Sequence, residues 1–209
     1  MKIVSNSIND GHPVLDRCAF GKIDAESHVA LSDNLSPHLA WSELPDGTRS
    51  LAVTCIDPDV PSVGDDVNQE GKTVPVDLPR VDFFHWAMVN VSPALGSIDE
   101  GAFSSGVTAG GKSGPIAPMG ASHAMNNYTQ WFDGDADMGG QYYGYDGPCP
   151  PWNDERLHHY HYTVYALDVD HISLPVDPDG PAVLAAMEGH VLASDTIVGT
   201  YTLNPAVAG

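Results

Sequence analysis

Basic side chains are scarce in this 209-residue chain, which has four Lys and four Arg against 22 Asp and six Glu. The formal net charge is −20 at pH 7. Nucleic acids and anionic membranes are bound through basic surfaces, so this composition argues against both as partners. The acidic residues occur singly or in pairs along the whole chain, which indicates an acidic folded surface rather than a disordered acidic tail.

Cysteines and long apolar runs are also few. The three cysteines, Cys18, Cys55 and Cys149, have a spacing that fits neither a disulfide framework nor a metal-binding motif. No stretch approaches the roughly 20 apolar residues that a membrane span needs. The first residues, MKIVSNSINDGHP, lack the apolar segment of a signal peptide. We therefore expect a cytoplasmic protein without stable membrane insertion.

Short strand-like segments separated by turn residues dominate the chain. The expected strands, including one that ends at Asp57, cover residues 38–41, 50–57, 81–91, 157–169 and 195–203. A helix is predicted in DPDGPAVLAAMEGHVLA, with Asp179 as N-cap and apolar residues at helical spacing as far as Val191 and Leu192. The segments 60–82 and 103–143 read as long loops. We predict a single, mainly β domain over residues 1–209.

The histidine-rich segment LHHYHYTVYALD can be sorted by the alternation of side chains along a strand. His158, Tyr160 and Tyr162 are expected on one face, and His159 and His161 on the other. The three neighbouring histidines therefore cannot all converge on one metal ion. The parity of this segment instead predicts a His158–Tyr160 pair on a common face.

Another histidine, His85, lies in the aromatic and β-branched segment VDFFHWAMVNV. Its parity predicts a face shared with Phe83, Ala87 and Val89. We therefore expect His85 and His158 to stand at strand ends over an apolar floor.

Two carboxylates, Asp57 and Asp59, flank a proline in DPDVP, directly after an apolar strand segment. With His85 and His158 they form a candidate open metal site, although three separated segments supply the ligands. A Cys149–His158 pair is a second possible hydrolase arrangement. Its thiol lies between two prolines, with no neighbouring cation to lower its pKa.

Four motifs, DPDVP, HWAMVNV, GYDGPCPP and LHHYHYTVYALD, occur in this order. They are preceded by LSPHLAWSELPDGTRSLAVTCI and followed by GHVLASDTIVGTY. Together they resemble the phosphatidylethanolamine-binding protein family, in particular its bacterial and archaeal Raf-kinase-inhibitor-like branch of the YbhB and YbcL type. The resemblance implies a large antiparallel sheet packed on a smaller sheet, with short helices towards the C-terminus.

The resemblance also implies a preformed pocket for small anions or phospholipid head groups, without catalysis and without a cofactor. The side chains that it assigns to this pocket are Asp57, Asp59, His85, Pro150, His158 and Tyr160. Imidazole N–H groups and a tyrosine hydroxyl can donate to anionic oxygens, and a carboxylate can orient a histidine. Pro150 belongs to the loop 147–151, which is expected to form the rim.

The sequence is also compatible with other functions. Relatives that regulate kinases raise the alternative of a protein-interaction module without a small ligand, and a homodimer is a further expectation from the same branch. The segments 60–82 and 103–143 are longer than in compact members of the family, and we expect them near the mouth of the pocket.

Overall fold

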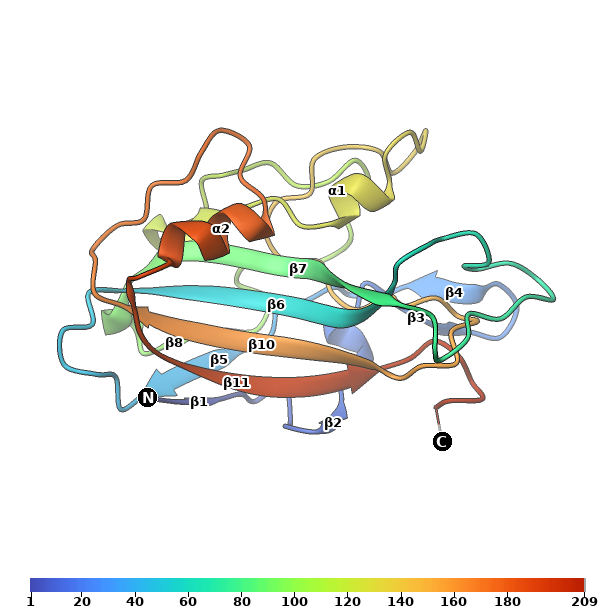
Figure 1. The fold of residues 1–209 in the computed structure, drawn as a ribbon, viewed down its shortest axis with the longest axis horizontal. Coiled ribbons are helices and arrows are strands. Elements are labelled where there is room, and N and C mark those ends of the chain that lie inside the picture. The colour runs from blue at the N-terminus through green and yellow to red at the C-terminus, as the bar shows by residue number, and fades with distance from the viewer. Residues whose placement is uncertain (209) are drawn as a thin grey trace.

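The computed structural model describes residues 1–208 and is built around a six-stranded sheet (Figure 1). Its strands follow the order β2-β11-β10-β6-β7-β9. Their bounds are His12–Pro13 (β2), Ser50–Pro61 (β6), Arg80–Val91 (β7), Ser122–His123 (β9), His158–Leu167 (β10) and Val191–Tyr201 (β11). Neighbouring strands are antiparallel, except that the short β2 pairs with β11 in parallel, so the large sheet is mixed at one edge.

A smaller antiparallel sheet packs on one face of the large one. It consists of β1 (Lys2–Val4), β5 (Leu39–Ser42) and β8 (Ser97–Ile98), and a separate hairpin is formed by β3 (Gly21–Asp24) and β4 (His28–Leu31). Buried side chains of both sheets, among them Ile3, Leu39, Trp86, Tyr162 and Val164, form one continuous core. This arrangement confirms the predicted two-sheet fold.

The alternation of burial along β10 follows the predicted parity. His158, Tyr160 and Tyr162 are fully buried on the core face, whereas His159 and His161 are only partly buried. Tyr160 and Tyr162 pack in the same core cluster. The alternation of side chains predicts burial correctly in β10, because one face of this strand lies in the core.

The predicted face of His85 was wrong with respect to Ala87 and Val89, which follow it in the strand. The reason is a β-bulge in β7. Cys55 of β6 pairs with Trp86, but the next residue, Ile56, pairs with Phe84. His85 is therefore the extra residue of the bulge. The insertion of one residue reverses the faces of the positions that follow it, as far as a second register shift between Met88 and Val91.

The bulge separates His85 from the two residues expected beside it. Ala87 and Val89 pack in a second cluster under helix α2 (Gly180–Met187). The His85 ring instead lies against Phe83 and Tyr160, with centroid distances of 4.7 and 5.1 Å. The expected proximity of His85 to Phe83 is thus confirmed, and its common face with Ala87 and Val89 is not.

Strand β6 does not end at Asp57 as predicted, but continues to Pro61. The pairing of Asp57 with Phe83 is followed, after a shift in register, by that of Val60 with Val81. Pro58 lies in this irregular part, where a residue without a backbone N–H is tolerated.

The predicted C-terminal helix is present but shorter than expected. Asp179 caps α2 by accepting a hydrogen bond from the backbone N–H of Ala182 at 2.9 Å. The helix ends at Met187, and Val191 and Leu192 belong to β11. Gly189, at φ +81°, reverses the chain between the two elements.

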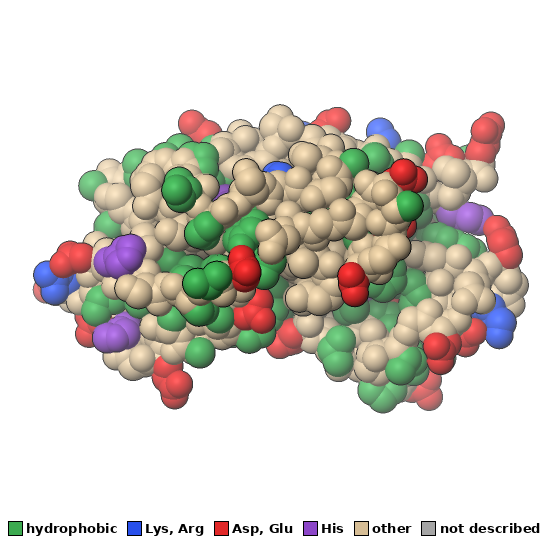
Figure 2. Space-filling view, turned by 90° about the horizontal axis from the view of Figure 1, so that it is seen from above, with side chains coloured by type: hydrophobic (Ala, Val, Ile, Leu, Met, Phe, Trp, Pro, Cys, Tyr) green, Lys and Arg blue, Asp and Glu red, His purple; other side chains and the backbone are tan. Residues whose placement is uncertain are grey.

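The remaining helical elements are short. The segment 103–143, expected as a loop, contains β9 and the one-turn helix α1 (Tyr128–Trp131). The 3₁₀ turns, labelled η1, η2 and η3, cover Asp16–Cys18, Pro93–Leu95 and Pro118–Gly120. Within residues 1–208 no helix is long and apolar enough to cross a membrane. On the face seen in Figure 2, acidic side chains are dispersed and basic ones are few.

Candidate functional site

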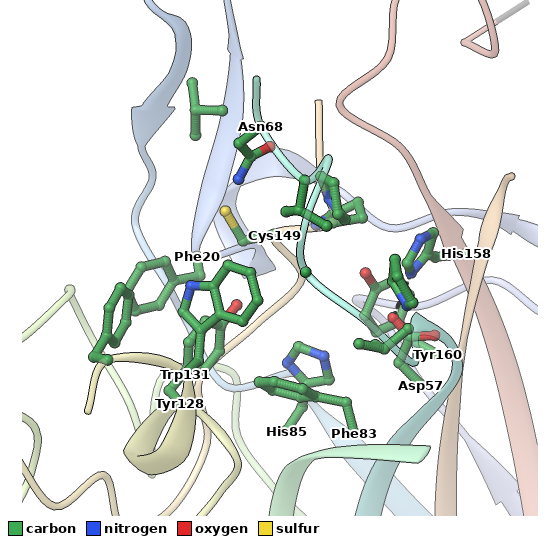
Figure 3. Close-up of a pocket in the computed structure, with 18 of the residues that line it drawn as sticks. Phe20, Asp57, Asn68, Phe83, His85, Tyr128, Trp131, Cys149, His158 and Tyr160 are labelled. Atoms are coloured by element: carbon green, nitrogen blue, oxygen red, sulfur yellow. Dashed lines mark hydrogen bonds and ion pairs between the residues drawn. The ribbon is translucent and has the colours of Figure 1, made fainter. Parts of the chain in front are cut away.

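A cavity of about 350 Å³ opens at the end of the large sheet where β6, β7 and β10 meet the hairpin β3–β4. The loop between β6 and β7 extends at this end of the molecule (Figure 1). In Figure 3, Asp57, His158 and Tyr160 lie on one side of the cavity, and Phe20, Tyr128 and Trp131 on the other. His85 lies between the two groups. The structure thus brings Asp57, His85, His158 and Tyr160 to one cavity.

His158 is held between two carboxylates. Its Nδ1 lies 2.7 Å from Oδ2 of Asp57, and its Nε2 lies 3.1 Å from Oδ2 of Asp154. Burial lowers the pKa of His158, but the hydrogen bonds and charges of Asp154 and Asp57 outweigh burial and raise it to about 9. His158 is therefore an imidazolium near neutral pH, and both of its N–H groups are already donated to the protein.

The same row of charges continues to an arginine. The Arg80 guanidinium donates to both carboxylate oxygens of Asp154, at 2.5 and 3.0 Å, and its side chain is 5% exposed. Asp57, His158, Asp154 and Arg80 thus alternate in sign, and the row carries no net charge. Removal of any one member would leave an unpaired buried charge, which is strongly destabilising.

His85 has a different protonation state from His158. Its Nδ1 lies 2.8 Å from the backbone carbonyl oxygen of Asp146, so Nδ1 carries the hydrogen and Nε2 is the unprotonated nitrogen of the neutral ring. Burial lowers the pKa of His85 to about 4, although the charge of Asp57 and the Asp146 carbonyl oppose this. The two histidines of the cavity therefore differ, one charged and one neutral.

Tyr160 supplies an unused hydroxyl group. The residue is fully buried and lines the cavity, and its hydroxyl oxygen has no hydrogen-bond partner among residues 1–208. A buried polar group without a partner costs about 1–3 kcal/mol. Among the residues that line the cavity, Tyr160 is the one whose buried polar side-chain atom lacks a partner within residues 1–208.

Of the other two predicted site residues, one lines the cavity and one does not. Pro150 lines the cavity as part of the rim loop. Asp59 is not among the lining residues; it accepts hydrogen bonds from the backbone and ring of His159 and from Arg156. Burial raises the pKa of Asp59, but these hydrogen bonds outweigh burial and lower it. Its backbone N–H donates to Oδ1 of Asp57, which holds that carboxylate in place.

Sequence reasoning missed Asp146, which anchors the rim loop. Its fully buried carboxylate accepts hydrogen bonds from Asn34 at 2.7 Å, Asn126 at 2.8 Å and Lys112 at 2.5 Å. Burial raises the pKa of this carboxyl group, and Lys112 acts in the opposite direction. The only signal in the sequence was its place next to Gly147 in GYDGPCPP. Asp154 was also missed, because its role depends on Arg80, which lies 74 residues away in the chain.

The aromatic side of the cavity comes from segments that the sequence analysis treated as a loop or left unassigned. Phe20 stacks on Tyr128 with ring centroids 4.5 Å apart, and Tyr128 stacks on Phe132 at 5.6 Å. Trp131 lines the cavity and is 48% exposed. The segment 103–143 therefore forms one wall of the cavity, and residues 60–68 supply part of another.

The hydrolase alternatives receive no support from the geometry. Burial raises the pKa of the Cys149 thiol to about 12, and no hydrogen bond joins it to a histidine in the described part of the chain. Both nitrogens of His158 are engaged, and Asp59 lies outside the cavity. Within residues 1–208 no group of three or more His, Cys, Asp or Glu side chains is arranged to hold a metal ion.

Comparison with known proteins assigns the family. The family model described as Phosphatidylethanolamine-binding protein matches residues 5–202. The chain therefore belongs to the phosphatidylethanolamine-binding protein family, as its motifs predicted.

Bacterial and archaeal proteins are among those similar to this chain. The UPF0098 protein YbhB of Escherichia coli strain K12 is 29% identical over 202 residues, which cover 97% of this chain and 100% of YbhB. A UPF0098 protein of Methanothermobacter thermautotrophicus is 31% identical over 171 residues, with 81% and 83% coverage. The crystal structure of E. coli YbcL, described as a new member of the mammalian PEBP family, matches with a TM-score of 0.67 at 25% identity and covers 96% of this chain and 97% of YbcL. These similarities place the chain in the YbhB/YbcL-type branch.

Proposed function

We propose that this protein binds a small anionic or phosphorylated ligand in the cavity between His85 and Tyr160, and that its function is binding rather than catalysis. The observation that carries the proposal is the hydroxyl of Tyr160, a residue of the cavity lining, which is buried and has no partner in the described structure. An anionic oxygen accepts hydrogen bonds only, so it would satisfy this donor. Membership of the phosphatidylethanolamine-binding protein family supports the same ligand class.

A second donor requires a proton on His85. Its Nδ1–H is already donated to the Asp146 carbonyl oxygen, so an anion can be bound by this ring only when Nε2 is protonated as well. Without a ligand, burial lowers the pKa of His85 more than the neighbouring groups raise it. The negative charge of a bound anion would raise this pKa and so favour a proton on Nε2. Binding of an anion is therefore coupled to the uptake of one proton. The titratable and polar groups around His85 are Asp57, Tyr128, His158, Tyr160 and the carbonyl groups of Asp146 and Gly147.

In this proposal His158 acts through Asp57 rather than by direct contact with the ligand. Its two N–H groups hold Asp57 and Asp154 in fixed positions. The Asp57 carboxylate beside the cavity would suit a ligand that also carries an amine, such as phosphoethanolamine. A cytoplasmic location, a homodimer and a protein partner remain predictions from the sequence.

The test is an NMR titration of the histidine rings with inorganic phosphate and with phosphoethanolamine. Saturable shifts are expected for His85. Replacement of Tyr160 by Phe removes one charge-assisted hydrogen bond and should weaken binding about tenfold or more.

His161→Gln is the matched control, because His161 lies on the same strand and faces away from the cavity face. This variant should bind as the wild type does. The absence of saturable shifts with either ligand would refute the proposal, and equal affinity in the Tyr160→Phe variant would refute the site.

A further inference from the structure

The cavity is larger and less polar than an inorganic anion requires. Its volume of about 350 Å³ falls within the roughly 300–1,000 Å³ that is typical of small-molecule sites. Most of its lining residues are apolar or aromatic. Asp57, His158 and Tyr160 lie on one side of the cavity, opposite the aromatic side (Figure 3). An oxyanion seated at His85 and Tyr160 would leave the aromatic side unfilled.

The aromatic side is organised as well as apolar. Tyr128 and Phe132 belong to α1 and the residue after it, and their rings are nearly parallel, with an interplanar angle of 16°. Phe20, next to the β3–β4 hairpin, packs on Tyr128 at the same angle, and its ring centroid also lies 6.0 Å from that of Phe132, so the three rings form one compact cluster. The indole of Trp131 remains 48% exposed at the cavity. Aromatic surface of this kind binds other rings by offset stacking.

The charges of the cavity do not favour a strongly charged ligand. No Lys or Arg side chain is among the described residues that line it. The imidazolium of His158 is neutralised by Asp57, and Arg80 is neutralised by Asp154. Next to the proposed acid site the donors are the Tyr160 hydroxyl and a protonated His85, and the other donors of the lining, on Ser62, Asn68 and Trp131, are uncharged. Much of the affinity must therefore come from apolar contact.

We propose, on the basis of the function proposed above, that the ligand is amphipathic: an organic acid or phosphate ester with a compact ring-sized apolar body. The acid group lies between His85 and Tyr160, and the body lies against Tyr128, Phe132 and Trp131. The body, rather than the anion, then determines which molecule the protein selects.

Three simple phosphates test this proposal by isothermal titration calorimetry. Inorganic phosphate and methyl phosphate probe the acid site, and phenyl phosphate adds the ring. We expect phenyl phosphate to bind at least tenfold more tightly than methyl phosphate, which corresponds to about 1.4 kcal/mol. Its binding should also change the fluorescence of Trp131.

Two variants of the aromatic side separate the body from the acid group. Trp131→Ala should reduce the affinity for phenyl phosphate about tenfold and leave that for methyl phosphate unchanged. Phe132→Ala should have the same effect, and it provides a second test from another side chain. Val176→Ala, at a position that is 90% exposed and outside the cavity lining, is the matched control and should change neither affinity.

The outcomes distinguish this proposal from the one on which it rests. If methyl and phenyl phosphate bind with equal affinity, the amphipathic ligand is refuted and anion binding stands. If Trp131→Ala weakens both ligands equally, the placement of the body is refuted. If no phosphate binds to the wild type, the proposed function itself fails.

Discussion

The ion-paired His158 should make the protein less stable above neutral pH. Its pKa is about 9 in the folded protein, against about 6.5 for an unperturbed histidine. Because folding raises this pKa, the folded state holds the proton more tightly than the unfolded state does. The resulting stabilisation is fully present below pH 6.5 and is lost as the pH rises through 9. A shift of about 2.5 units at 1.36 kcal/mol per unit corresponds to a loss of about 3 kcal/mol.

Urea unfolding at a series of pH values from 6 to 9.5 measures this loss. The comparison variant is His158→Gln, whose amide can still donate to a carboxylate but does not titrate. The difference in free energy of unfolding between the two proteins should shrink by about 3 kcal/mol over this range. Burial also raises the pKa values of the Cys55 and Cys149 thiols, so these groups make stability depend on pH as well. Their contributions are common to both proteins and cancel in the difference.

An independent measurement does not depend on the folding of the variant. The ring signals of His158 in the wild-type protein should titrate near pH 9 in NMR spectra. A midpoint below pH 7, or a free energy of unfolding that is equal for both proteins at every pH, would refute the assignment of His158 as a buried imidazolium.

Three further predictions concern the rest of the site. The affinity for dimethyl phosphate, which stays a monoanion, should rise as the pH falls from 8 to 6, because His85 takes up a proton on binding. The rise should approach about tenfold per pH unit. Calorimetry that shows a constant affinity would contradict this prediction. Lys112→Met should lower the free energy of unfolding by about 3 kcal/mol, since it leaves the buried Asp146 carboxylate without its cation, and denaturant unfolding with Lys112→Arg as the conservative control measures the effect. Gly147→Ala should cost about 1–3 kcal/mol in the same assay, because a Cβ there would lie 2.1 Å from the backbone oxygen of Cys18; wild-type stability would show that the rim loop is not closely packed.

Periodicity predicted the parts of the site that lie on a regular strand. The alternation in β10 placed His158 and Tyr160 on the buried face, and the structure confirms this. Asp179 was recognised as a helix cap because capping depends on neighbouring residues only. Local patterns of this kind are sufficient where the backbone is regular.

The same reasoning failed where the backbone departs from regularity. Alternation could not predict the faces of Ala87 and Val89, because the bulge at His85 adds one residue to β7. The residue types around His85 are ordinary for a strand and give no sign of the bulge. The helical spacing that included Val191 and Leu192 belongs in fact to two elements. Apolar residues fit both patterns over short stretches, so the pattern alone could not locate the end of the helix.

Motifs and composition were sufficient for the family, for the strand that carries His158 and Tyr160, and for the acidic, cysteine-poor character of the chain. The charge states within the cavity, in contrast, depend on the folded structure. His158 is charged because Asp57, 101 residues away in β6, and Asp154, in the loop before β10, reach both of its nitrogens. His85 is neutral because burial outweighs the single carboxylate near it. Protonation depends on distances between residues far apart in the chain, and these distances exist only once the sheet, the rim loop and the aromatic wall are assembled.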